Sequence, residues 1–256
     1  MITENQIHSL AKRWEIDQIT VMREYLQILF LFYLYAQRKS DKIFFKGGTA
    51  IRFLFGSFRF SEDLDFTGTL ESDEIIGLFN NACSDLNREI PAVEMENFKK
   101  KRNSIVSRIR YTPKPDTYPL GIHLEISIRE RPITKAASHI ETLLPVSPYP
   151  VVTHLESEEI MAEKIRALLK RAKGRDLFDL WYLLTKEVKL NWDMVKKKME
   201  FYNDAATLTD LVSAVKAFNQ KKLFDDLAKF LPRAQRKTIP GLKENILEKL
   251  GRFAVT

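Results

Sequence analysis

The chain has 256 residues and only one cysteine, Cys83, so it cannot form an internal disulfide. This excludes the disulfide-stapled secreted folds and the metal centres that are held by several cysteines. We therefore expect a protein of a reducing compartment with no disulfide partner. A chain of this length buries about 70–75% of its unfolded surface, so its core can stabilise it without cross-links.

Long apolar runs and low-complexity segments are also lacking. The longest apolar run is Ile28–Ala36, far short of the ~20 residues of a membrane helix, and it predicts a buried core helix. Nine glycines and ten prolines exclude collagen-like and low-complexity chains. Residues 1–17 lack the basic segment and apolar stretch of a secretory signal. We expect a soluble cytoplasmic protein with no membrane partner.

Acidic residues are outnumbered, with 34 Asp and Glu against 41 Lys and Arg and a formal charge of +7. This balance favours a polyanionic partner such as a nucleic acid. The positive charge is concentrated in two clusters, and the first contains no acidic residue. Their members are Lys99, Lys100, Lys101, Arg102, Arg108, Arg110 and Lys114, then Lys164, Arg166, Lys170, Arg171, Lys173 and Arg175. Taken singly, each cluster is also compatible with a solvated surface.

Hydrophobic periodicity predicts strands mixed with helices, followed by helices alone. The expected helices are 5–38, 49–55, 72–90 and most of the chain after about 153, and the expected strands are 43–45, 60–66, 104–111 and 120–128. Prolines at 145, 148 and 150 mark a boundary. The pattern predicts an α+β fold with a core in residues 1–150 and a helical C-terminal part in residues 151–256.

A glycine turn at Gly47 and Gly48 lies between the first expected strand and helix. Glycines let a backbone approach phosphate closely, and the free N–H groups at a helix start bind anions. Thr49 can add a hydroxyl there. The turn is therefore a candidate phosphate site, and the alternative is an ordinary tight turn.

Two aspartates, Asp63 and Asp65, are two positions apart on the expected strand 60–66, so they project to the same face. Like charges side by side on a sheet are unfavourable without a counter-ion, which suggests a bound Mg²⁺. The alternative is a pair of solvent-facing aspartates at a strand edge. A glycine turn upstream makes the combination more specific than an isolated Asp-x-Asp.

A third carboxylate, Glu125, lies on the polar face of the expected strand 120–128. Phosphoryl transfer with two metals needs such a group on a neighbouring strand, to activate the attacking hydroxyl or complete a metal shell. The alternative is an exposed edge residue. His123 shares this face, and we interpret it as a hydrogen-bonded bystander.

Two helices after residue 156 carry the last candidates. Ser157 is the expected N-cap of the first helix, Lys164 is expected beside its apolar stripe, and Gly174 is expected to end it. Asp176 and Asp179 lie on one face near the start of the second helix. The alternative for these aspartates is helix capping and an i,i+4 pair with Arg175, each worth about 0.5 kcal/mol.

Three segments together carry a family resemblance: KGGTAIRFLFGSFRFSEDLDF, HLEIS and SEEIMAEKIRALLKRAKGRDLFDLW. In this order they resemble the AbiEii-type nucleotidyltransferases, which are prokaryotic toxins of the polymerase-β-like superfamily. The resemblance covers about residues 46–184. It implies a nucleotidyltransferase core with a mixed sheet, N-terminal helices and a helical C-terminal part, in a prokaryotic cytoplasmic protein.

The resemblance also implies site roles. The triphosphate would be held by Gly47, Gly48, Thr49 and Lys164, and Mg²⁺ or Mn²⁺ by Asp63, Asp65 and Glu125. Asp176 and Asp179, with Arg175 before them, correspond to the family's basic-Asp-x-x-Asp element and would belong to the catalytic set.

The function implied is a toxin that transfers a nucleoside monophosphate from an NTP to RNA, with the tRNA 3′ end as acceptor, and that has a cognate antitoxin. Transfer to a small molecule or to a protein is the first alternative. A non-catalytic nucleotide- or RNA-binding module is the second.

Overall fold

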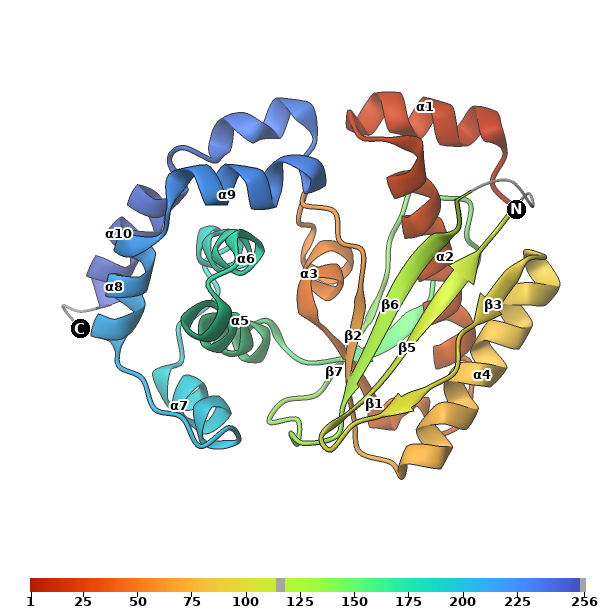
Figure 1. Ribbon diagram of the computed structural model, residues 1–256, viewed down its shortest axis with the longest axis horizontal. Coiled ribbons are helices and arrows are strands. Elements are labelled where there is room, and N and C mark those ends of the chain that lie inside the picture. Colours follow the sequence, from red (N-terminus) through yellow and green to blue (C-terminus); the bar gives the residue numbers. More distant parts are fainter. Residues whose placement is uncertain (114–117, 254–256) are drawn as a thin grey trace. The chain divides into compact units, whose positions relative to one another are not determined.

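The computed structural model describes residues 1–113 and 118–253 (Figure 1). Lys114, a member of the first basic cluster, lies outside the described residues. The chain forms two compact units. The first comprises Met1–Gly56 and Phe60–Leu155, and the second comprises Ser57–Arg59 and the chain from Glu156 onward. A short piece of the N-terminal sequence thus belongs to the second unit.

The first unit contains a mixed eight-stranded sheet in the part of the chain that the structure describes. Its order is β3-β5-β6-β2-β1-β8-β7, with β4 also paired to β5. The β1–β8 and β2–β6 pairs are parallel and the others antiparallel. The strands are β1 (Ile43–Lys46), β2 (Leu64–Gly68), β3 (Val93–Met95), β4 (Lys99–Lys100), β5 (Ser104–Tyr111), β6 (Leu120–Ser127), β7 (Ala136–His139) and β8 (Val151–His154).

One face of this sheet is apolar and covered by helices α2 (Gln18–Tyr35) and α4 (Ser72–Glu89) (Figure 1). The ring of Phe79 in α4 packs 5.7 Å from Phe30 in α2 and 5.2 Å from Phe66 in β2. All three side chains are fully buried. The core of the first unit therefore lies between the sheet and this helix pair, and the buried run Ile28–Leu31 belongs to it.

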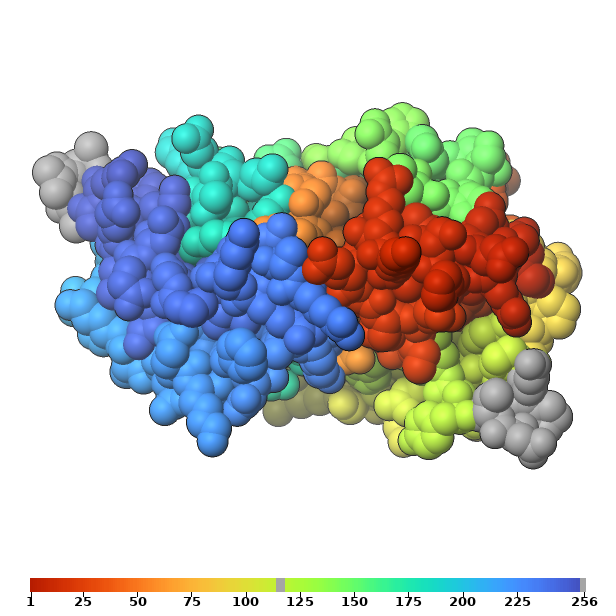
Figure 2. Space-filling model, turned by 90° about the horizontal axis from the view of Figure 1, so that it is seen from above, coloured from red at the N-terminus to blue at the C-terminus, as the bar shows by residue number. Residues whose placement is uncertain are grey.

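The segment 5–38 is largely helical, as predicted, and it contains two helices separated by a short break. Helix α1 (Glu4–Trp14) ends where Glu15 adopts a left-handed conformation with φ of 52°. Asp17 then caps α2 by accepting a hydrogen bond from the Thr20 amide. Figure 2 shows α1, in red, on the surface of the first unit.

The strands differ from the sequence prediction in two respects. Strand β2 begins at Leu64, not at residue 60, because Phe60 is buried against Trp14 and beneath the guanidinium of Arg52. The strands β3, β4, β7 and β8 have at most four residues each and were not predicted. Segments so short show too few alternations to be recognised. The helix α3 (Gly47–Phe55), closed by Gly56 in a left-handed conformation, agrees with the prediction.

The regular secondary structure among the described residues of the second unit is helical. Its helices are α5 (Ser157–Arg171), α6 (Gly174–Thr185), α7 (Trp192–Glu200), α8 (Leu208–Ala217), α9 (Gln220–Leu227) and α10 (Leu242–Phe253). Short 3₁₀ turns occur at Ser40–Lys42 in the first unit and at Ala228–Phe230 and Arg233–Thr238 in the second. The fully buried Lys198 of α7 joins α5 through an ion pair with Glu159, 2.6 Å away.

The ends of α5 correct two predictions. The N-cap is Glu156, and Ser157 is the first helical residue. The helix ends with Ala172 in a left-handed conformation, and Gly174 begins α6 instead of ending α5. A Cβ atom on Gly174 would lie 2.8 Å from the Cβ of Asp226, whose carboxylate accepts a hydrogen bond from the Gly174 amide at 2.7 Å. This glycine therefore permits the close approach of α9.

None of the described helices combines the length and the apolar character that crossing a membrane requires.

Candidate functional site

The glycine turn places an acidic side chain against bare backbone. Gly47 has a φ of +80°, which favours glycine. A Cβ atom on Gly47 would lie 2.1 Å from Oδ2 of Asp65 and 2.8 Å from its Cβ. Position 47 therefore excludes any side chain while Asp65 keeps its place. The carboxylate of Asp65 lies directly beside the start of α3.

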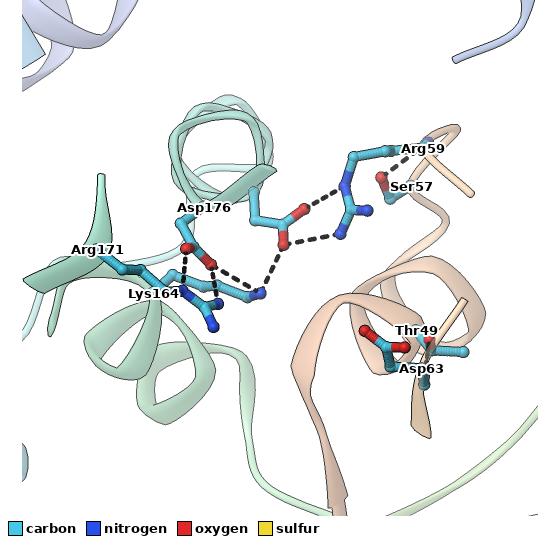
Figure 3. Close-up of polar contacts among 8 residues, drawn as sticks. Thr49, Ser57, Arg59, Asp63, Lys164, Arg171 and Asp176 are labelled. Carbon is cyan, nitrogen blue, oxygen red and sulfur yellow. Dashed lines mark hydrogen bonds and ion pairs between the residues drawn. The ribbon is translucent and has the colours of Figure 1, made fainter. Parts of the chain in front are cut away.

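Thr49 ties the start of α3 to the segment before β2. Its hydroxyl donates a hydrogen bond to the carbonyl oxygen of Asp63, and the side chain is 1% exposed (Figure 3). The hydroxyl proton is thus committed to the protein backbone. This contact fixes the position of Asp63, immediately before β2, relative to the start of α3.

Asp65 and Glu125 lie directly opposite each other on the parallel strands β2 and β6. Neighbouring strands are about 4.8 Å apart, and directly paired residues share a face of the sheet. Glu125 therefore lies on the same face as Asp65, as its alternation predicts. Asp63 precedes β2 instead of lying on it, which corrects the expectation of two aspartates within one strand.

A cation flanks this pair on its other side. Lys46 of β1 is opposite Asp65, so Lys46, Asp65 and Glu125 form one row across three strands. The Nζ of Lys46 lies 3.9 Å from a carboxylate oxygen of the buried Glu130.

Among the residues that the structure describes, no three His, Cys, Asp or Glu side chains are grouped so that they could hold a metal ion by themselves. The row supplies two hard carboxylate donors instead. Mg²⁺ is usually held by one or two carboxylates together with water and substrate phosphates, so a pair of this kind is compatible with a metal that arrives with a nucleotide.

In the second unit, Lys164 of α5 contacts both aspartates of α6 (Figure 3). Its Nζ lies 2.7 Å from Oδ2 of Asp179 and 3.5 Å from Oδ1 of Asp176. Arg59 donates two hydrogen bonds of 2.9 Å to the two oxygens of Asp179. Arg171 donates two to Asp176, at 2.7 and 2.9 Å. We call these five residues the buried ion cluster, although Arg171 closes it from the surface and is itself exposed.

Lys164 is only 8% exposed, so the expectation that it merely flanks the core is wrong. The apolar stripe of α5 places Lys164 at its margin, but α6 covers that margin and provides two carboxylates. Burial by itself would lower the pKa of the Lys164 ammonium; the charges of Asp179 and Asp176 outweigh burial and raise it above its usual value. Lys164 therefore stays protonated.

The carboxyl of Asp176 shows the complementary shift. Burial opposes its ionisation, but Lys164 and Arg171 outweigh burial and lower its pKa below the usual value. Asp179 does not form the i,i+4 pair considered from the sequence, because it binds Lys164 and Arg59. The guanidinium of Arg175 lies 4.9 Å from the centre of the Phe230 ring.

Sequence reasoning missed Arg59 and Arg171 as members of this cluster. Arg59 is 120 positions from Asp179 in the chain and 2% exposed, and no local pattern connects the two. Arg171 follows Lys164 by seven residues, two turns of the same helix, and this spacing was an available signal.

The second basic cluster is largely engaged within its own unit. Lys164 and Arg171 belong to the buried ion cluster, Lys170 pairs with Asp204 at 2.5 Å, and the guanidinium of Arg166 lies 3.6 Å from the centre of the Tyr202 ring. The interpretation of this cluster as a solvated surface is wrong for the buried Lys164, whereas Lys170, Arg171 and Lys173 are exposed.

Comparison with known families shows to which family the chain belongs. Residues 29–249 match the family described as nucleotidyl transferase AbiEii toxin, type IV toxin–antitoxin system. The chain belongs to the AbiEii family. It is thus a nucleotidyltransferase of a toxin family whose members act with an antitoxin, and the predicted family is confirmed. No curated protein matches the chain.

Solved structures show that the AbiEii-family chain has the expected nucleotidyltransferase fold. JHP933 from Helicobacter pylori is similar with a TM-score of 0.57 and 24% identity, over 94% of this chain and 97% of that one. MenT4, a nucleotidyltransferase toxin from Mycobacterium tuberculosis, has a TM-score of 0.65 and 17% identity, over 100% of this chain and 91% of that one. The predicted α+β class, with its mixed sheet and helical C-terminal part, is confirmed.

Proposed function

We propose that this AbiEii-family protein transfers a nucleoside monophosphate from an NTP to the 3′ end of RNA, with tRNA as the acceptor. The observation that carries the proposal is the row of Asp65 and Glu125 beside the bare backbone of Gly47. It joins an anion-accepting helix start to two hard oxygen donors on one sheet face.

The nucleotide would be held through its phosphates. The amides at the start of α3, at Gly48 and Thr49, suit phosphate oxygens, and Gly47 leaves room for the carboxylate of Asp65 beside them. Lys164 is the proposed second phosphate contact. Asp176 and Asp179 keep the ammonium of Lys164 charged and hold it in position. Arg59 and Arg171 in turn bind these two aspartates, so all four are positioning residues that act through Lys164.

Mg²⁺ or Mn²⁺ would be held by Asp65 and Glu125 together with phosphate oxygens of the nucleotide, and when bound it would neutralise charge on the phosphates. The 3′ hydroxyl of the acceptor attacks the α-phosphorus, a new phosphorus–oxygen bond forms, and the bond to the β-phosphate bridge breaks to release pyrophosphate. Glu125, which is exposed on the sheet face, would accept the hydroxyl proton.

Modification of the tRNA 3′ end would stop translation and growth, which fits a toxin that requires a cognate antitoxin. The positive charge of the chain supports an RNA acceptor, because cationic residues replace the counter-ions of the phosphate backbone.

The direct test is incubation of the protein with each labelled NTP, Mg²⁺ and total RNA, followed by a denaturing gel. We expect label in the tRNA band with one or more NTPs, and less transfer as salt is added. Label in a protein band or in a small molecule would instead establish the first alternative. Specific NTP or RNA binding without any transfer would establish a binding module.

Asp65→Asn provides the matched variant, since it removes the charge of the proposed metal ligand and keeps its shape. We expect transfer to fall at least a hundredfold at matched Mg²⁺, with a thermal midpoint equal to or above that of the parent, because Asp65 and Glu125 repel each other without a metal. Parental activity in this variant would rule out the proposed metal site.

A further inference from the structure

The sheet face that carries Asp65 and Glu125 continues onto β5 and β4. Val106 of β5 is directly opposite Glu125, and Lys99 of β4 is directly opposite Val106. Because directly paired residues share a face, Lys99 lies in the same row as the two carboxylates. Helices α2 and α4 cover the other face, so this is the face on which Lys99 and Glu125 are exposed.

The next positions along β5 and β6 add a second cation and a flat surface. Arg108 is opposite His123, and Arg110 is opposite Gly121. Arg108 is exposed, and His123 is half-buried. A Cβ atom on Gly121 would lie 3.1 Å from Cδ of Arg108 and 3.5 Å from its Nε. The side chain of Arg108 therefore lies across the bare backbone of Gly121.

Lys99 and Arg108 carry the available positive charge of this face. Within the described ranges, neither side chain has a carboxylate at ion-pair distance. Their neighbours differ: Lys100 lies 2.6 Å from Asp73, and the Nε of Arg110 lies 3.8 Å from a carboxylate oxygen of Glu96. An anionic partner therefore meets Lys99 and Arg108 first.

We propose that the surface formed by Lys99, Arg108, Gly121 and His123 binds the single-stranded 3′ end of the acceptor RNA. This inference rests on the proposed function and names the acceptor path. The phosphates of the strand contact Lys99 and Arg108, and a base stacks on His123. The terminal hydroxyl then reaches the neighbouring Glu125.

The spacing of the surface suits an extended single strand. Lys99 is diagonal to Arg108, one strand across and two positions along, because Lys99 is opposite Val106, and diagonal neighbours are about 7–8 Å apart. This is of the order of the distance between successive phosphates in an extended strand. Unpaired bases stack on flat side chains, and single-stranded ends are the parts of RNA that proteins can reach in this way.

The test measures RNA binding directly, so it does not depend on transfer. The probe is a 5′-fluorescein single-stranded RNA with a free 3′ hydroxyl, followed by anisotropy as a function of salt. For Arg108→Gln we expect about five- to tenfold weaker binding and a salt slope reduced by about one. The control is Arg88→Gln on α4, whose side chain is 79% exposed and lies over the other layer of the first unit. It should bind like the parent.

The variant Gly121→Val distinguishes an effect on the RNA-binding surface from an effect on the stability of the sheet. Valine favours a strand, so the thermal midpoint should be unchanged or higher, but its side chain displaces Arg108 and should weaken RNA binding in the same direction. If both variants bind RNA like the parent, or if polyglutamate competes as well as RNA does, the inference is overturned. Parental transfer to RNA alongside that result leaves the proposed function intact. RNA binding that depends on Arg108 without any transfer contradicts only the proposed function.

Discussion

At the scale of single residues, Lys164 differs most from its sequence-based description. Its position in α5 predicts a surface lysine, but the structure buries it between Asp176 and Asp179. A buried ammonium is tolerated only with paired charges, so the two aspartates and Lys164 depend on one another. Changing Lys164 therefore affects both stability and the proposed phosphate contact.

Lys164→Met should nearly eliminate transfer and toxicity and lower the free energy of unfolding by about 2 kcal/mol, since it removes two contacts to buried carboxylates that Arg59 and Arg171 still satisfy. Differential scanning calorimetry measures the change in stability, and NTP binding measures the loss of the proposed phosphate contact. Lys170→Met on the same helix, with its exposed pair to Asp204, should cost within about 0.5 kcal/mol. Equal behaviour of the two variants would show that Lys164 has no special role.

At the scale of elements, the strand–turn–helix of β1 and α3 determines where Asp65 lies. The turn works only without a side chain at position 47, since the positive φ and the carboxylate of Asp65 both exclude a Cβ. The hydroxyl of Thr49 then fixes the entry to β2 through Asp63. Local backbone geometry thus positions the carboxylate row.

Gly47→Ala should therefore displace Asp65, reduce transfer at least tenfold and destabilise the protein by about 1–3 kcal/mol through backbone strain and overlap. Gly77→Ala on α4 is the control, because no atom lies within 4 Å of its Cβ position, and it should stabilise the helix by about 0.5–1 kcal/mol. Thermal unfolding and the gel assay give both readouts. An alanine at 47 that retains parental activity and stability would contradict the close packing of Asp65.

At the scale of the whole molecule, the buried ion cluster links stability to pH. The lowered pKa of Asp176 contributes stability that is present above its unfolded value of about 3.9 and is lost as pH falls through the folded value. The raised pKa of Lys164 contributes stability that is present below about 10.4 and is lost as pH rises through the folded value. Urea unfolding should accordingly show a plateau between these limits.

Asp176→Asn should remove part of the loss of stability on the acid side while lowering stability at neutral pH. Equilibrium unfolding in urea from pH 2.5 to 7 measures this difference. Parallel curves for parent and variant over that range would show that Asp176 does not contribute to the acid transition.

The sequence by itself determined the elements that have long periodic patterns or specific turns. The strands β5 and β6, the helix α4, the glycine turn and the polar-face position of Glu125 within its strand follow from alternation, length and backbone chemistry. These features are local, so a single chain segment contains the information that sets them.

The tertiary structure alone decided the pairings between distant segments. Ser57–Arg59 is flanked in the sequence by residues of the first unit but belongs to the second unit, where Arg59 binds Asp179. Asp179 of α6 also pairs with Lys164, which the helix pattern places at the margin of α5 and which the structure buries. Burial and ion pairing depend on which elements cover a residue, and a helix pattern shows only that a face is present, not which partner will cover it.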